Sequence, residues 1–214
     1  MKKIFLLLLM IFVVSGCGGT AQDKTSAEPE KKSTNDKVSA TDKKILVVYF
    51  SRTGEEYNVG TITKGNTAIV ADYIAQNIGA DKFEIKPATP YPDVYDACTE
   101  LAKRELESNV RPALAKNIDN LAQYDTIFVG YPIWWGAVPR VVMTFFENNN
   151  FNGKTIVPFC THGGSGLAGT EREIADACPN AKILPGLAIV GKTAQNDSAA
   201  VKQEVDTWLT KLGY

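Results

Sequence analysis

Residues 44–67, KILVVYFSRTGEEYNVGTITKGNT, decide the fold of this chain. The apolar run at residues 45–50 predicts a strand buried on both faces, and the residues after Asn66 and Thr67 predict a helix with one of these two at its N-cap. The turn between them begins with Ser51, Arg52 and Thr53. Because the first amides of a helix lack internal partners and its dipole favours negative charge, hydroxyl groups at such a turn predict an anion site, with phosphate the expected anion. The alternative is an ordinary strand–helix connection rich in hydroxyl groups.

The first sixteen residues have the pattern of an export signal. Two lysines precede an apolar run at residues 4–14, which is shorter than the roughly 20 residues that a membrane-spanning helix needs. The following Val-Ser-Gly-Cys resembles the lipobox of bacterial lipoproteins. We therefore expect cleavage of residues 1–16, lipidation of Cys17, and a protein anchored on the extracytoplasmic face of a bacterial membrane. A plain secretory signal with an incidental cysteine is the alternative.

Residues 17–42 are mostly small, polar and charged, so they cannot bury a core. They predict a disordered tether that leads to a single domain at residues 43–214. Loss of Lys2 and Lys3 with the signal would reduce the 23 basic residues to 21, against 24 acidic ones. No basic stripe follows the tether, and we expect no nucleic-acid partner.

Three cysteines lie in the expected domain: Cys98, Cys160 and Cys178. None of them is spaced as C-x-x-C, and the chain holds one histidine, so no metal site is expected. Outside the cytoplasm a disulfide between Cys98 and Cys178 remains open from the sequence. Otherwise the three thiols are expected to be small buried side chains.

Strand and helix patterns alternate five times along the domain. Apolar runs predict strands at residues 45–50, 124–131, 154–160 and 183–190, and an alternating polar and apolar pattern predicts one at residues 81–86. Helices are expected from residue 66, through residues 98–107 and 138–146 with Pro139 in the first turn, from a Thr170-x-x-Glu173 capping box to residue 177, and from Asp197 or Ser198 onward. This order predicts an α/β fold, a doubly wound five-stranded parallel sheet with helices on both faces.

The second and fifth strands have the features of sheet edges. Residues 81–86 alternate polar and apolar, and Pro185 in the fifth strand is tolerable only near an edge. The strand order 2-1-3-4-5 places both at the edges. Ligands of such sheets bind beyond the carboxyl ends of the strands where the order reverses, so the loops after strands one, three and four are expected to converge on one ligand.

Two of these loops suit a flat ligand. The loop after the third strand consists of Pro132, Ile133, Trp134, Trp135 and Gly136, and its two large rings fit an aromatic system. The loop after the fourth strand consists of Thr161, His162, Gly163, Gly164, Ser165 and Gly166, and its glycines let backbone approach a ligand closely. His162 could donate a hydrogen bond to a bound ring or substrate, or have no chemical role. One tryptophan in the core and the other on the sheet is the alternative for the first loop.

Without residues 55–65, the loop after the first strand reads S-R-T-G-N-T, which resembles the phosphate loop of flavodoxin-like proteins with a long-loop insertion. The G-Y-P-x-W-W-G and T-x-G-G-S-G loops are similar to those of flavodoxin-like and NAD(P)H:quinone oxidoreductase families. The resemblance covers residues 43–214 and implies FMN as cofactor. It implies that the phosphate is held by Ser51, Arg52, Thr53, Asn66 and Thr67, and the ring by residues 132–136 and 161–166. The role of the insertion stays open.

The resemblance implies electron transfer, in one of two forms. The protein is either a one-electron carrier that docks a redox protein, or a reductase that gives two electrons to a small acceptor such as a quinone. The near-neutral charge counts against the carrier, because soluble flavodoxins dock through a strongly acidic face. The expected location counts against the reductase, because NAD(P)H is scarce outside the cytoplasm. A flavin-free ligand-binding lipoprotein on the same scaffold is the alternative from another class.

Two other motif matches are expected to be accidental. Residues 186–193 fit G-x-x-x-x-G-K-[ST], but their middle is a strand pattern and no helix is expected at Lys192. His162 to Ser165 is similar to the oxyanion loop of esterases, but the single histidine lies too near this serine to act as its base. A hydrolase is therefore not expected.

Overall fold

A computed structural model describes residue 11 and residues 44–214 of the chain. The predicted signal peptide and tether, with Cys17, lie outside the described residues apart from Ile11. Within the described residues, no helix is both long and apolar enough to cross a membrane.

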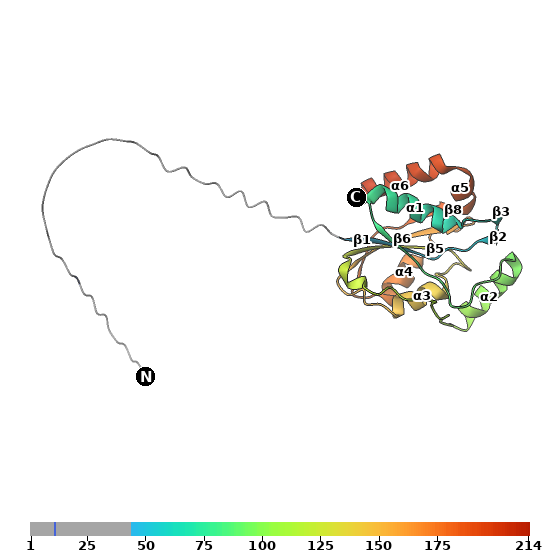
Figure 1. The fold of residues 1–214 in the computed structure, drawn as a ribbon, viewed down its shortest axis with the longest axis horizontal. Helices are drawn as coiled ribbons and strands as arrows, with labels where there is room; N and C mark the ends of the chain where they lie inside the picture. The colour runs from blue at the N-terminus through green and yellow to red at the C-terminus, as the bar shows by residue number, and fades with distance from the viewer. Residues whose placement is uncertain (1–10, 12–43) are drawn as a thin grey trace. The chain divides into compact units, whose positions relative to one another are not determined.

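One parallel sheet in the order β4-β1-β5-β6-β7 forms the centre of the domain, and β8 also pairs with β6 (Figure 1). These strands are β1 (Ile45–Tyr49), β4 (Asp81–Glu84), β5 (Thr126–Pro132), β6 (Thr155–His162), β7 (Lys182–Ile183) and β8 (Leu187–Val190). All of their pairings are parallel. The predicted α/β class and the order 2-1-3-4-5 are confirmed, with the second strand at an edge.

The fifth predicted strand is divided into β7 and β8, which pair with successive parts of β6. Pro185 lies between the two pieces and has no N–H group to donate to the ladder. Its carbonyl accepts a hydrogen bond from Trp208 Nε1 at 3.0 Å. The proline therefore interrupts the strand, and the sheet has six strands where we expected five.

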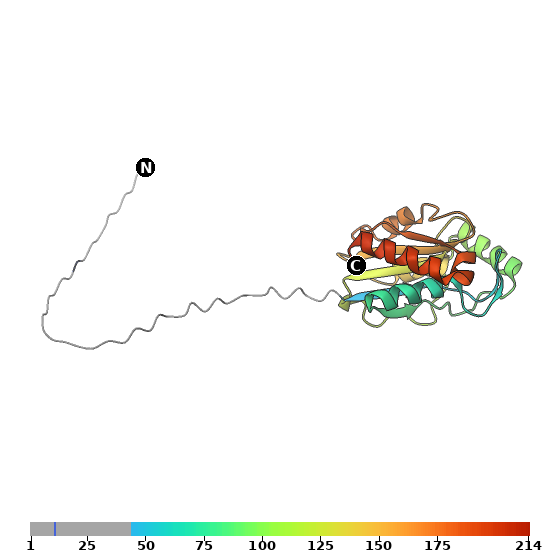
Figure 2. The same ribbon diagram turned by 90° about the horizontal axis from the view of Figure 1, so that it is seen from above.

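Helices cover both faces of the sheet, as Figure 1 shows. One face packs against α1 (Asn66–Ile78), α5 (Gly191–Asn196) and α6 (Ser198–Leu212), and the other against α2 (Tyr95–Glu107), α3 (Arg140–Glu147) and α4 (Thr170–Ala177). In Figure 2, α1 and α6 lie side by side along the sheet. Neighbouring strand residues such as Leu46 and Val47 are both buried because they face the two opposite helical layers. A short 3-10 turn, η1 (Leu121–Gln123), precedes β5.

The inserted segment after β1 forms a small hairpin of its own. The strands β2 (Gly54–Glu56) and β3 (Gly60–Ile62) pair antiparallel, separate from the main sheet. Asn58 in the turn has a φ of 54°, in the left-handed region that Asn tolerates. The sequence did not lead us to expect any regular structure here.

Helix ends differ from prediction in three places. Gly65, not Asn66 or Thr67, is the N-cap of α1, and Pro139 is the N-cap of α3. The capping box at α4 is wrong, because the N-cap is Gly169 and the Thr170 hydroxyl donates to the Leu167 carbonyl instead. At α6 the prediction is confirmed, since Asp197 accepts a hydrogen bond from the amide of Ala200 at 2.9 Å.

The cysteines are buried and unbonded: Cys98, Cys160 and Cys178 are all free thiols, so the disulfide left open between the first and last does not form. The rejected P-loop match needs one correction. A helix does start there, since α5 begins at Gly191. The match still fails because β8 lies between its two glycines, whereas a P-loop needs its strand before the first.

Candidate cofactor site

A cavity of about 510 Å³ opens beyond the carboxyl ends of the central strands, where the strand order reverses. Twelve of the predicted site residues line it: Arg52, Asn66, Pro132, Ile133, Trp134, Trp135, Gly136, Thr161, His162, Gly163, Gly164 and Ser165. The loops after β1, β5 and β6 therefore converge as the sequence predicts. Ser51, Thr53, Thr67 and Gly166 do not line the cavity.

The start of α1 forms one end of the cavity. The first hydrogen bond within the helix runs from the Ile69 amide to the Gly65 carbonyl, so the amides of residues 66–68 precede it. Ser51 Oγ accepts from the Ala68 amide at 3.1 Å, and the amides of Asn66 and Thr67 remain. This terminus keeps the donors and the dipole that suit an anion.

Two predicted phosphate ligands have other partners in the structure. Thr67 is buried, and its Oγ1 lies 2.8 Å from Thr161 Oγ1, which ties α1 to β6. The Asn66 carboxamide oxygen accepts from Gln195 Nε2 at 2.8 Å. Thr53, by contrast, is exposed. The side chain of Thr67 therefore positions the helix, whereas its amide is left for a ligand.

Arg52 points toward the hairpin rather than toward the start of α1. Its guanidinium donates to the carbonyls of Pro92 (2.7 Å), Asp93 (3.2 Å) and Glu55, and Nε pairs with Glu56 Oε1 at 3.1 Å. The side chain is only 7% exposed. Arg52 therefore fastens the hairpin to the segment that precedes α2.

The two tryptophans have different environments. Trp135 and Gly136 have φ of 53° and 74° in a tight turn closed by the mutual backbone hydrogen bonds of Trp134 and Ala137. The Trp134 ring packs edge-on against Phe50 and Tyr91, with centroids 5.3 and 4.8 Å away. The Trp135 ring is 55% exposed and donates from Nε1 to the Thr99 carbonyl at 2.9 Å. Both rings line the cavity, one fixed by the core and one by α2.

The loop after β6 is organised by its histidine. His162 Nδ1 accepts hydrogen bonds from the amides of Gly164 (2.9 Å) and Gly166 (3.1 Å). Burial lowers the pKa of His162, which agrees with Nδ1 as an acceptor. In the neutral ring the proton is then on Nε2, which is the atom left to donate.

The sequence analysis did not identify seven residues that line the cavity. Glu56 and Tyr57 come from the hairpin, and Gly191 from the start of α5. Tyr95, Cys98, Thr99 and Ala102 come from α2. The Tyr57 ring contacts Gly163, where an added Cβ would lie 2.8 Å from it, and its centroid is 6.1 Å from that of Tyr95. The two glutamates and the tyrosine inside the insertion, Glu55, Glu56 and Tyr57, were the signal that could have pointed to this wall.

The chain belongs to the flavodoxin family, whose profile matches residues 44–211. It is similar to crystal structures of two proteins provisionally classed as flavoproteins. One, from Bacteroides uniformis, is 34% identical with a TM-score of 0.62, over 77% of this chain and 98% of that one. The other, from Bacteroides eggerthii, is 30% identical with a TM-score of 0.62, over 80% and 98%.

A third similar structure is a flavoprotein in complex with FMN from Lactobacillus acidophilus. It is 21% identical with a TM-score of 0.56, over 78% of this chain and 98% of that one, so it supports the fold. Among curated proteins none matches the chain.

Proposed function

We propose that this protein binds FMN in the cavity and uses it to reduce a small acceptor. The observation that carries this proposal is the cavity itself, which joins a helix N-terminus with open amides to a set of flat side chains. Its lining includes Asn66, at the start of α1, and the rings of Trp134 and Trp135, so it combines an anion-binding terminus with flat side chains, which suit the phosphate and the ring of FMN.

The residues present fit this cofactor. The amides of Asn66 and Thr67 would hold the phosphate at the positive end of α1. The loops 132–136 and 161–166 would hold the ring. Of the predicted ligands, Arg52 contributes least directly, because its guanidinium is engaged with the hairpin.

Bound FMN would supply the redox chemistry, accepting and releasing one or two electrons. The chain's own residues would orient it and control access. The Trp134 ring is fixed by two edge-on aromatic contacts, and His162 keeps its loop in place through two amide hydrogen bonds. His162 Nε2–H is the donor that this loop offers toward the cavity.

Reduction of a small acceptor is favoured over docking of a redox protein by the rim of the cavity. Tyr57 and Trp135 are both exposed and both line the cavity, so they offer aromatic surface to a flat acceptor. A one-electron carrier is the second candidate. The test between them is steady-state quinone reduction by the FMN-loaded protein.

The lipobox at residues 14–17 supports a membrane anchor on Cys17 and a position on the extracytoplasmic face. Expression of the Cys17→Ser variant should move the protein from the membrane fraction to the soluble fraction. Unchanged fractionation of this variant would count against the anchor and leave the FMN proposal intact.

FMN binding is tested by the absorbance spectrum and fluorescence of purified protein titrated with FMN. We expect Asn66→Asp to weaken affinity about tenfold, because it puts a negative charge beside the phosphate while keeping the oxygen that accepts from Gln195. Asn152→Asp, the same change at an exposed turn, should leave affinity unchanged. Protein that quenches no FMN at micromolar concentration would instead support the flavin-free binding protein.

A further inference from the structure

The hairpin places a carboxylate in the cavity, and this carboxylate is not one of the predicted cofactor-binding residues. Glu56 ends β2, lines the cavity and has a side chain only 18% exposed. Its Oε1 pairs with Arg52 Nε at 3.1 Å. Among residues 44–214, no donor is paired with its Oε2, so this cavity-lining carboxylate has one oxygen without a partner.

The position of Glu56 is set by its surroundings rather than by chance. Arg52 pairs with the Glu56 carboxylate and donates to the Glu55 carbonyl. It also donates to the carbonyls of Pro92 and Asp93. The Glu55 amide donates to the Asp93 carbonyl at 2.8 Å, and Glu55 Oε2 accepts from the Tyr95 amide at 3.0 Å. Both strand and side chain are therefore fixed against the start of α2.

Five titratable or charged groups share this wall with Glu56 or face it across the cavity: Arg52, Tyr57, Tyr95, Cys98 and His162. Burial raises the pKa of Cys98 to about 11 and also raises that of Tyr95, so both keep their protons near neutral pH. His162 is neutral there, since burial lowers its pKa and its Nδ1 is occupied by two amides.

Glu56 is the one carboxylic acid among the described residues that line the cavity. Burial raises the pKa of its carboxyl, while the charge and hydrogen bond of Arg52 lower it in part. A carboxyl group with a raised pKa keeps its proton at a higher pH than a free glutamate, which suits a general acid.

We propose that Glu56 is the proton donor of this site when a quinone-type acceptor is reduced. This inference rests on the proposed function. Reduction of a quinone to a hydroquinone consumes two electrons and two protons. The quinone takes both electrons and one proton from the reduced cofactor, which returns to its oxidised form, and takes the second proton from the Glu56 carboxyl. The carboxyl O–H bond breaks, a hydroquinone O–H bond forms, and water reprotonates the partly exposed carboxylate.

The test compares Glu56→Gln with Glu107→Gln, an exposed carboxylate at the end of α2 whose loss removes the same charge away from the cavity. Glutamine at position 56 keeps an oxygen for Arg52 Nε but carries no exchangeable acid. Each protein is loaded with FMN, and its midpoint potential is measured from pH 5 to pH 9.

We expect the parent and Glu107→Gln to show a midpoint potential that falls more steeply with pH than that of Glu56→Gln. At low pH Glu56 is protonated and neutral in the parent and in Glu107→Gln, and the glutamine of Glu56→Gln is neutral as well. The three midpoint potentials should therefore coincide. At high pH the charged Glu56 disfavours added electrons, so the parent should lie below Glu56→Gln. The rate of quinone reduction at neutral pH should fall about 100-fold in Glu56→Gln, and Glu56→Asp should restore part of the pH profile.

Parallel potential curves for all three FMN-loaded proteins, with equal quinone rates, would overturn the role of Glu56 while leaving FMN binding in place. Failure of the parent itself to bind FMN would overturn the proposed function and this inference with it. Urea unfolding of each variant tests whether it is folded, so that a lower rate of quinone reduction can be distinguished from unfolding.

Discussion

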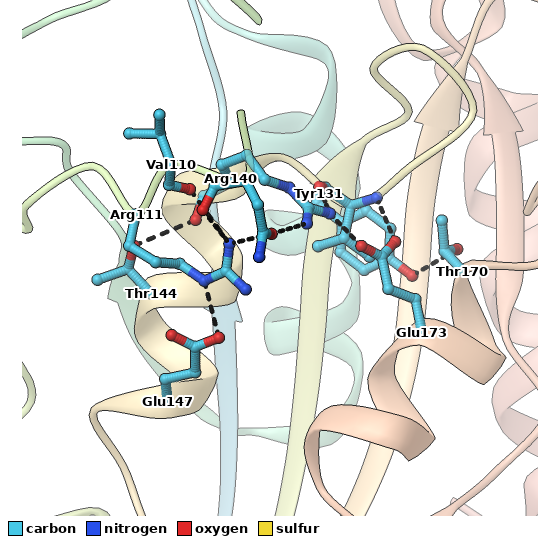
Figure 3. Close-up of polar contacts among 10 residues, drawn as sticks. Val110, Arg111, Tyr131, Arg140, Thr144, Glu147, Thr170 and Glu173 are labelled. Atoms are coloured by element: carbon cyan, nitrogen blue, oxygen red, sulfur yellow. Dashed lines mark hydrogen bonds and ion pairs between the residues drawn. The ribbon is translucent and has the colours of Figure 1, made fainter. Parts of the chain in front are cut away.

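The domain contains two partly buried Arg–Glu pairs that are similar in geometry but differ in how their carboxylates are paired. Arg140 and Glu173 pair between α3 and α4, and Figure 3 shows them within a chain of polar contacts. Arg52 and Glu56 pair within the hairpin at the cavity. In each pair the arginine side chain is 7% exposed.

The difference lies in the carboxylates. Glu173 has both oxygens occupied, Oε1 by Arg140 and Oε2 by the Val138 amide at 2.9 Å. Glu56 has only Oε1 occupied. Because a buried charge is stable only when its polar atoms find partners, the carboxylate of Glu173 is complete as a structural link, although Arg140 Nε is buried without a partner among residues 44–214. The second pair leaves an oxygen free for chemistry in the cavity.

The largest effect is expected for Arg140→Met. This change leaves Glu173 without its cation and the Val138 carbonyl without a donor, and should lower the free energy of unfolding by about 3 kcal/mol. Urea denaturation measures it. Arg104→Met, in an exposed pair with Glu100, should change stability by less than about 0.5 kcal/mol. Equal losses in the two variants would remove the structural role given to Arg140.

A smaller effect, confined to the cavity, is expected for Arg52→Met. The hairpin loses its side-chain links to Pro92 and Asp93, and we expect about 2 kcal/mol of lost stability. Amide hydrogen exchange should accelerate at Glu55, whose N–H donates to Asp93, and remain slow in β5. Uniform acceleration through the sheet would mean that Arg52 supports the whole fold.

Substitution of the two glutamates should have different effects on stability. Glu173→Gln weakens charged contacts on both oxygens and should cost about 1.5 kcal/mol, whereas Glu56→Gln should cost close to nothing at neutral pH. The pH dependence adds a sign. Because the folded protein raises the pKa of Glu56 above 4.5, it binds this proton more tightly than the unfolded chain does.

The stability that the protonated Glu56 contributes is therefore lost as pH rises from about 4.5 through its folded pKa. Relative to the parent, Glu56→Gln should gain stability over that interval and then level off. Urea titrations at a series of pH values measure the difference. A difference that stays constant with pH would show that Glu56 is not destabilised by its burial.

The smallest effect concerns the ring beside Glu56. Tyr57→Ala removes an exposed aromatic wall that contacts Gly163, and should weaken FMN binding about fivefold without changing stability. Tyr57→Phe keeps the ring and should bind FMN like the parent. Fluorescence titration distinguishes them, and equal affinity in all three would leave the hairpin only its carboxylate as a contribution to the site.

The sequence predicted the sheet well because its central strands, β1, β5 and β6, are continuous apolar runs, as expected of a parallel sheet covered on both faces. The predicted strand order also led us to expect that the loops containing Trp134 and His162 lie close together, and both line the cavity. The cofactor expectation, FMN, agrees with the family match and with the FMN complex among the similar structures. Individual ligands of the cofactor remain predictions.

Local signals were less reliable where a tertiary partner competed. Glu173 has the spacing of a capping residue, but Arg140 and the Val138 amide occupy it. At the start of α1, Ser51 Oγ accepts the hydrogen bond of the Ala68 amide, a role that the N-cap side chain would otherwise have. Cys98 and Thr99 reach the cavity only because the hairpin and α2 are fastened together, a contact between segments 40 residues apart that no local pattern encodes.

The two ends of the hairpin meet. A Cβ added to Gly65 would lie 2.3 Å from the Arg52 carbonyl and 2.1 Å from Ser51 Oγ, so the chain returns to within contact of its point of departure. The hairpin therefore leaves and rejoins the chain at one place, so a loop of another length could be joined there at a small cost in closure entropy. Such an exchange would replace the wall that carries Glu56 and Tyr57, and it would have to keep the hydrogen bonds to residues 93–95 that hold this wall.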